Sequence, residues 1–86
     1  MSIPFSDVSP DVIMMHLAKA AEHLTEVSNY APVANIPNYA EVGEVSQLAF
    51  LLTLATKQLA EGDQKQAQAT LKSVHSQLAQ MVDDEP

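Results

Sequence analysis

Hydrophobic and polar residues alternate with a helical period in three stretches of the chain, and no stretch shows the two-residue period of a β-strand. The first stretch covers residues 9–28, and the third covers residues 63–82. Placed at 100° per residue, the first predicts an apolar stripe with Met14 at its edge. That stripe contains Ile13, Leu17, Ala20, Ala21, Leu24 and Val27. The third predicts a narrow stripe of the coiled-coil type, made of Ala67, Leu71, Val74, Leu78 and Met81.

The middle stretch, residues 39–61, is apolar nearly all round. One face resembles those of the other helices and contains Val45, Leu48, Leu52, Ala55 and Leu59. Phe50 and Leu54 lie roughly opposite that face, and Leu51 lies between the two sets. A helix that is apolar on every side is normally buried. Two further helices cannot easily surround it.

Proline, glycine and capping residues set the expected boundaries of these helices. Ser9 and Pro10 are typical of a helix start, and Asn29 with Pro32 is expected to end the first helix. Pro32 and Pro37 then mark a loop.

The second and third helices have their own signals. Asn38 and Glu41 have the spacing of a capping box at the start of the second helix. Gly62 suits the end of that helix, and Asp63 can cap the third. Such a tight turn predicts an αα-hairpin. The sequence thus predicts one all-α, three-helix domain over residues 1–86, with an extended segment 1–8, helices 9–28, 39–61 and 63–82, a loop 29–38 and an acidic tail 83–86.

Composition narrows the function. The chain has 86 residues, no cysteine, no arginine, four lysines and 11 acidic residues, for a formal net charge of −7. Direct nucleic-acid binding is not expected, because it requires several cations against phosphates. The uncharged run from Val45 to Thr56 has 12 residues, against about 20 for a membrane span. No secretory signal is visible, so we expect a cytoplasmic protein with no membrane association.

No residue pattern indicates catalysis, a metal or a cofactor. His16 and His23 share one flank of the first helix, but seven residues separate them by about 10 Å, too far for one metal ion. No serine, threonine or lysine has the motif of an activated nucleophile. We therefore expect a protein that is not an enzyme and has no catalytic, cofactor-binding or metal-ligating residues.

The doubly apolar middle helix favours self-association, since small helical domains commonly complete their cores by pairing. The expected interface residues are Met15, Phe50, Leu51 and Leu54. The alternative is that the first helix, with the segments around Ile3/Phe5 and Tyr30/Tyr39, covers Phe50 and Leu54 within one chain.

Three function classes follow. The leading hypothesis is a regulator or adaptor that contacts an unidentified protein through its helices and acts as a dimer or higher homo-oligomer. A second is an acidic inhibitor of phage or plasmid type that occupies the basic nucleic-acid groove of another protein. A third is a small-molecule binder with an interhelical or intersubunit pocket. The loop residues that could contact a ligand or partner are Tyr30, Asn35, Asn38 and Tyr39.

Overall fold

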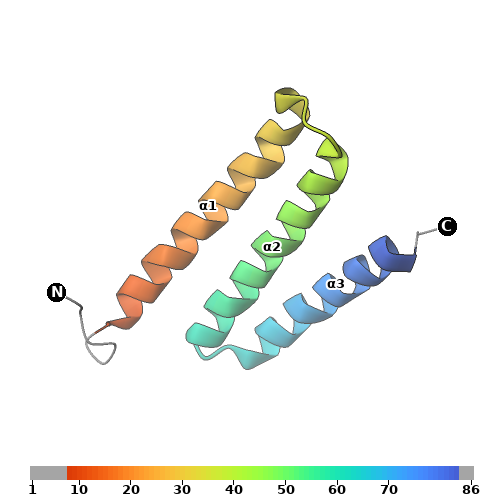
Figure 1. The fold of residues 1–86 in the computed structure, drawn as a ribbon. Coiled ribbons are helices and arrows are strands. Elements are labelled where there is room, and N and C mark those ends of the chain that lie inside the picture. Colours follow the sequence, from red (N-terminus) through yellow and green to blue (C-terminus); the bar gives the residue numbers. More distant parts are fainter. Residues whose placement is uncertain (1–7, 84–86) are drawn as a thin grey trace.

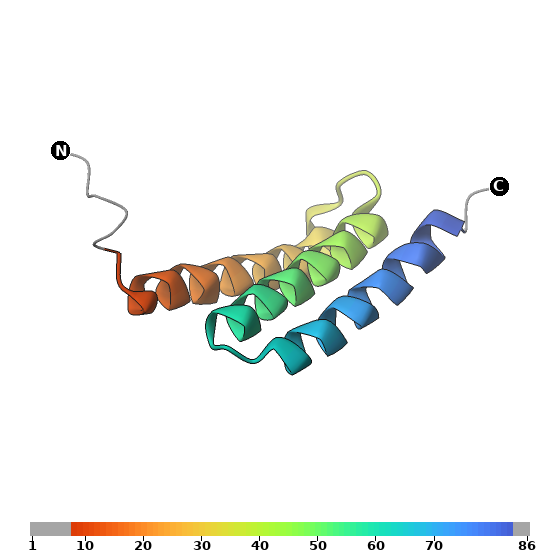
Figure 2. The same cartoon turned by 90° about the horizontal axis from the view of Figure 1, so that it is seen from below.

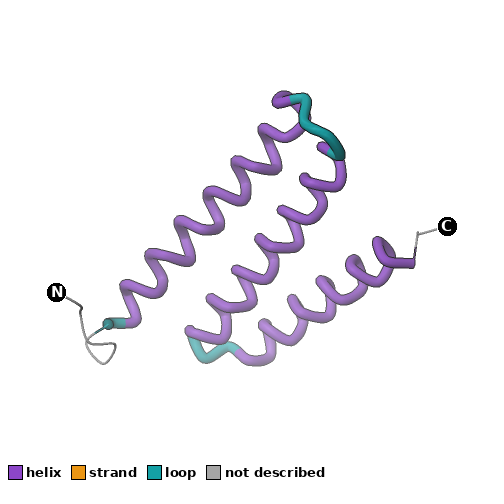
Figure 3. Tube along the Cα trace, viewed as in Figure 1, coloured by secondary structure: helices purple, strands orange, loops and turns teal. Residues whose placement is uncertain are grey.

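A computed structural model describes residues 8–83 of the chain. It contains α1 (Pro10–Ala34), α2 (Tyr39–Ala60) and α3 (Gln64–Asp83), with no strand in the described part (Figures 1 and 3). The all-α, three-helix expectation is therefore confirmed. Most of the expected N-terminal segment, residues 1–7, and residues 84–86 of the expected acidic tail lie outside the described residues.

The three helices form an open layer with α2 in the middle. α2 packs against α1 along one side and α3 along the other, whereas no Cα atom of α1 lies within 8 Å of one in α3. Figure 2 shows the helices side by side, and in Figure 1 α3 diverges from α2 beyond the turn that joins them. Each of the outer helices is thus supported by α2 alone.

α1 is longer than the sequence predicts. It continues through Pro32 to Ala34, and Asn35, not Asn29, has the left-handed conformation that ends it, with φ 56°. A proline removes one backbone donor and disfavours a helical conformation in the residue before it. That residue is Ala31, which is buried beside α2. Tertiary packing of the last turns explains why the helix passes the proline.

The start of α2 also differs from the expected capping box. Asn38 precedes the helix, but its φ is 56° and its side chain makes no capping hydrogen bond. Its carbonyl oxygen instead accepts a bond from the backbone N–H of Val42 at 2.9 Å. Asn35 and Asn38 therefore serve the loop through their tolerance of a left-handed backbone.

The turn between α2 and α3 has the predicted chemistry. Gly62 has φ 83°, and its N–H donates to the Leu59 carbonyl at 3.0 Å. The N–H of Asp63 donates to the Gln58 carbonyl at 2.8 Å, which completes a Schellman motif. The carboxylate of Asp63 then accepts a bond from the N–H of Gln66 at 3.2 Å and caps α3. This turn fixes the αα-hairpin.

The helix contacts are made mainly by small side chains, so the core is thin. Among the described residues the buried apolar side chains are Ala31, Leu48, Ala55, Ala67 and Val74, with Ser46 as a buried polar residue. In that part of the chain, no large side chain is completely buried. One layer of helices leaves most of its larger apolar residues half covered.

Candidate interaction surface

Seven of the exposed apolar side chains line up on one side of the helix layer. On α1 they include Val27, which lines a hollow of about 350 Å³ together with Val42 of α2. Val42 therefore marks the side of α2 that matches the Val27 side of α1. Positions three, seven, ten and 14 residues beyond Val42 lie within about 100° of it on the helix. They are Val45, Ala49, Leu52 and Thr56, followed by Leu59.

α3 contributes to the same side. The hydroxyl of Thr70 donates to Oε1 of Gln58 at 2.8 Å, so Thr70 lies on the Gln58 side of α2. Leu71 is the next residue and lies about 100° further round the helix. It is therefore on the opposite side of the contact between α3 and α2 from Thr70. Leu78, seven residues beyond Leu71, shares its position.

We call this surface the apolar face. Each of its seven side chains is 41–54% exposed. They are Ile13, Val27, Val45, Leu52, Leu59, Leu71 and Leu78. None of the seven is charged. Charged residues border the face on each helix: Glu26 lines the Val27 hollow, Glu41 lies at the start of α2, and Lys72 shares a hollow with Leu71. The centre of the surface is therefore apolar, and its charges lie at the edge.

The other side of the layer, the polar face, carries hydrogen bonds between side chains. Gln47 Nε2 donates to Oγ of Ser28 at 3.4 Å and connects α2 with α1. The Thr70–Gln58 bond connects α3 with α2. On the same side, Gln77 Nε2 donates to Oγ of Ser73 at 3.4 Å within α3. Gln47, Gln58 and Gln77 on this face are paired within the chain, whereas no described helix covers the apolar face.

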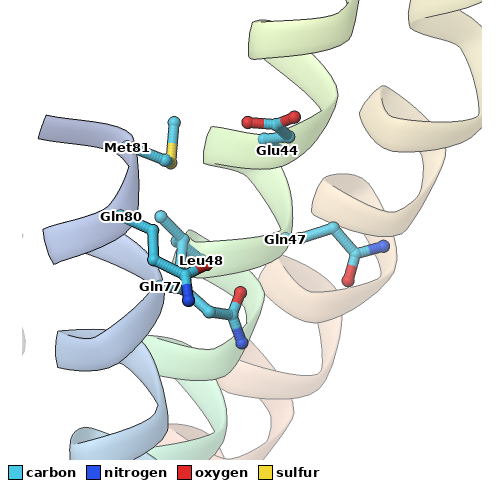
Figure 4. Close-up of a pocket in the computed structure, with 6 residues that line it drawn as sticks. All are labelled: Glu44, Gln47, Leu48, Gln77, Gln80 and Met81. Atoms are coloured by element: carbon cyan, nitrogen blue, oxygen red, sulfur yellow. The ribbon is translucent and has the colours of Figure 1, made fainter. Parts of the chain in front are cut away.

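A hollow of about 350 Å³ opens where α3 diverges from α2. Figure 4 shows its lining, with three residues from each helix: Glu44, Gln47, Leu48, Gln77, Gln80 and Met81. Gln47 points away from α3, towards α1, in agreement with its bond to Ser28. Four of its six lining residues are polar, so the hollow extends the polar face.

The structure places the residues expected at an interface in two different locations. Phe50 and Leu54 are half-buried against α1, where they line a hollow with Met14, Leu17, Ala18 and Ala21. Leu51 is also half-buried. Met15 is 47% exposed and lies on the side of α1 turned away from α2. The four residues therefore do not form one continuous surface, and α1 provides partial cover for Phe50 and Leu54.

The loop residues are also dispersed. Tyr30 is 64% exposed and lines the hollow that contains Val27, together with His23, Glu26 and Ile36. Asn35, Asn38 and Tyr39 are exposed but do not line it. Of the four expected loop residues, only Tyr30 lines this hollow.

Titratable side chains do not converge elsewhere in residues 8–83. His23 Nδ1 lies 3.8 Å from Oε2 of Glu26, one turn on, and both side chains are exposed. No group of three or more histidine, aspartate or glutamate side chains in the described chain is placed to hold a metal ion. Within the same residues, no helix has the length and hydropathy needed to cross a membrane.

Sequence reasoning assigned the seven residues of the apolar face to stripes within a core, and so missed them as a surface. The signal was present as seven-residue spacing: Val45, Leu52 and Leu59 on α2, and Leu71 and Leu78 on α3. Spacing identifies a stripe but cannot say whether a neighbouring helix covers all of it.

Comparison with known proteins gives no relative. No family model, curated protein or solved structure matches the chain.

Proposed function

We propose that this chain is a non-enzymatic interaction module of the cytoplasm, a regulator or adaptor that works as a homo-oligomer and binds another protein through its helices. The apolar face is the single observation that carries the proposal. Contiguous exposed apolar surface of this kind is characteristic of association sites in soluble proteins.

Stability supports the same conclusion. The described core has five buried apolar side chains, of which three are alanines. Burying a leucine or valine side chain fully is worth about 1.5–3 kcal/mol, and typical domains are stable by only about 5–15 kcal/mol. Covering the half-exposed leucines and valines of the apolar face therefore changes the stability of the chain substantially.

Light scattering after size exclusion tests the oligomer. We expect a multiple of the 9.3 kDa chain mass at micromolar concentration. A 9.3 kDa particle that unfolds cooperatively at every concentration would show that the single layer is sufficient, and would contradict the proposal.

The adaptor role needs a second test. Proteins that co-purify with three tagged chains are compared: the wild type, Met15→Asp and Leu52→Asp. Each candidate partner is then titrated against the purified chain. We expect at least one direct partner whose affinity is equal for wild type and Met15→Asp. Absence of any direct binding would leave self-association without an adaptor function.

A further inference from the structure

We infer that the apolar face is covered by the same face of a second copy, with the two α2 helices antiparallel, which gives a six-helix assembly of two stacked layers. This inference rests on the proposed homo-oligomer and names its surface, its occupant and its orientation. In the assembly each helix lies across from its own counterpart.

The spacing of the apolar face suits another helix layer. Ile13, Ala20 and Val27 repeat every seven residues on α1, in the same way as the leucines and valines of α2 and α3. A seven-residue repeat keeps a line of side chains directed at a partner helix along its length. A second copy presents the same repeat on all three of its helices.

The midpoints of the three lines of side chains lie side by side, at the same height along the helix axes. Leu52 is the middle residue of its line on α2, and Ala20 is the middle residue on α1. Ala21 and Thr53, their sequence neighbours, line one hollow, so the two midpoints lie level with each other.

α3 is centred at the same level. The Thr70–Gln58 bond and the hollow shared by Gln77 and Leu48 fix its register against α2. Because α2 and α3 are antiparallel, Val74, between Thr70 and Gln77, lies beside Leu52, between Gln58 and Leu48. Val74 is also midway between Leu71 and Leu78. A two-fold axis crossing the helices at this level superimposes each line on its counterpart, as an isologous interface requires.

Charge sets the direction in which a second copy can pack. Three of the four charged residues of α1 lie on its outer side, away from the apolar face: Asp11, Lys19 and Glu22. Glu26 lies at the edge of the face, in the hollow lined by Val27, and Lys72 of α3 shares a hollow with Leu71. Stacking two faces therefore keeps the outer charges in solvent, although each chain carries −7. Glu41 lies 11 residues from Leu52 (52 − 41), so antiparallel pairing separates the two Glu41 residues by about 33 Å. A parallel pair would bring them together.

The area also fits. Covering the exposed half of all seven side chains buries roughly 600 Å² of surface per chain. A standard stable interface buries about 800 Å² per partner, including its rim. The face alone thus approaches the size of a stable dimer interface.

Single-cysteine cross-linking tests the inference, because the native chain has no cysteine. The variants are Leu52→Cys and, as a control of equal exposure, Met15→Cys, at 46% and 47% exposed. Light scattering gives the mass of each under reducing conditions, and circular dichroism gives its helicity. Oxidation is then followed on non-reducing gels. We expect dimers of unchanged helicity, with Leu52→Cys at least tenfold faster to form a disulfide than Met15→Cys.

Orientation is read from two more variants. In a mixture of Val45→Cys and Leu59→Cys chains, the antiparallel arrangement predicts that the cross-link between different variants predominates. Efficient self-linking of Val45→Cys would overturn the antiparallel order. Equal rates for Leu52→Cys and Met15→Cys in a dimeric protein would overturn the assignment of the face while leaving the proposed oligomer intact. A monomeric wild type would overturn both.

Discussion

Thr70 and Gln58 connect the two helices of the αα-hairpin through one short hydrogen bond, with the Thr70 hydroxyl 2.8 Å from Oε1 of Gln58 and 3.1 Å from the Gln66 carbonyl of its own helix, the longer of the two contacts. Both side chains are half-buried. The bond lies on the polar face, one residue before Leu71 of the apolar face, so adjacent residues of α3 serve opposite sides of the layer. It also lies close to the Gly62 turn, where α3 is nearest to α2.

Removing this bond should destabilise the hairpin. We expect Thr70→Val and Gln58→Leu to show a coupling energy of about 0.5–1.5 kcal/mol in a double-mutant cycle, the usual net value of a protein hydrogen bond. Urea unfolding at one fixed protein concentration measures it. Thr25→Val is the control, because the Thr25 hydroxyl donates only within its own helix, to the Ala21 carbonyl. Additive effects of the two substitutions would show that the bond contributes nothing.

A charge in the middle of the apolar face should disrupt the assembly. Leu52→Asp places a carboxylate where two copies meet, and we expect the mass in solution to fall to that of one chain. Met15→Asp introduces the same charge at a position of the same exposure on the far side of α1, and its mass should equal that of wild type. The opposite order, with Met15→Asp dissociated, would assign the interface to the outer side of α1.

The assembly should tolerate salt. None of the seven side chains at its centre is charged, and charges at the edge, such as Glu26, Glu41 and Lys72, are screened within about 10 Å at 0.1 M salt. We expect the dissociation constant not to rise between 0.05 and 0.5 M sodium chloride, measured by sedimentation, because salt also screens the repulsion between two chains of charge −7. Binding of a partner that weakens steeply over the same range would favour the acidic-inhibitor hypothesis for that second interaction.

The two glycines should respond in opposite directions to alanine. Gly43 is helical, and a Cβ there meets nothing within 4 Å, so Gly43→Ala should stabilise the chain by about 0.5–1 kcal/mol. Gly62 has φ 83°, which costs a residue with a Cβ about 1–2 kcal/mol. Thermal unfolding of the two variants at equal concentration compares them. A stabilised Gly62→Ala would mean that the turn does not require a left-handed residue.

α3 should depend on a small residue at its closest approach to α2. Ala67 is fully buried, at 0% exposure, so Ala67→Leu must separate the two helices, and overpacking of this kind costs about 1–3 kcal/mol. Ala69 is exposed on the same helix, and Ala69→Leu should have almost no effect on the free energy of unfolding. Similar values for the two variants would indicate that α3 can shift without cost.

The hairpin could be predicted from sequence because its signals are local. Gly62 and Asp63 act within a few residues of their positions in the chain, and their conformations and hydrogen bonds follow from residue type. The end of α1 could not be predicted in this way, because local preference at Pro32 opposes the helix while packing of Ala31 against α2 favours it.

The candidate site was predictable only as a pattern. Phe50 and Leu54 stood out because they interrupt the regular stripe of α2, yet α1 lies against them. Val45 and Leu52 looked like ordinary core positions, yet no helix of the described chain covers them. The angles between helices decide which side of an apolar helix meets a neighbour. Small residues at the contacts, such as Ala55 and Ala67, set those angles, and the largest side chains do not.

The lack of contact between α1 and α3 has a kinetic consequence. Every pair of helices that touch in the described layer is adjacent in the sequence. The mean sequence separation between touching residues is therefore low, and chains of this type fold within microseconds to milliseconds. Each helix can dock onto its neighbour without closing a long loop. The slow event is then the bimolecular encounter of two preformed layers, so the refolding time should shorten as the protein concentration rises.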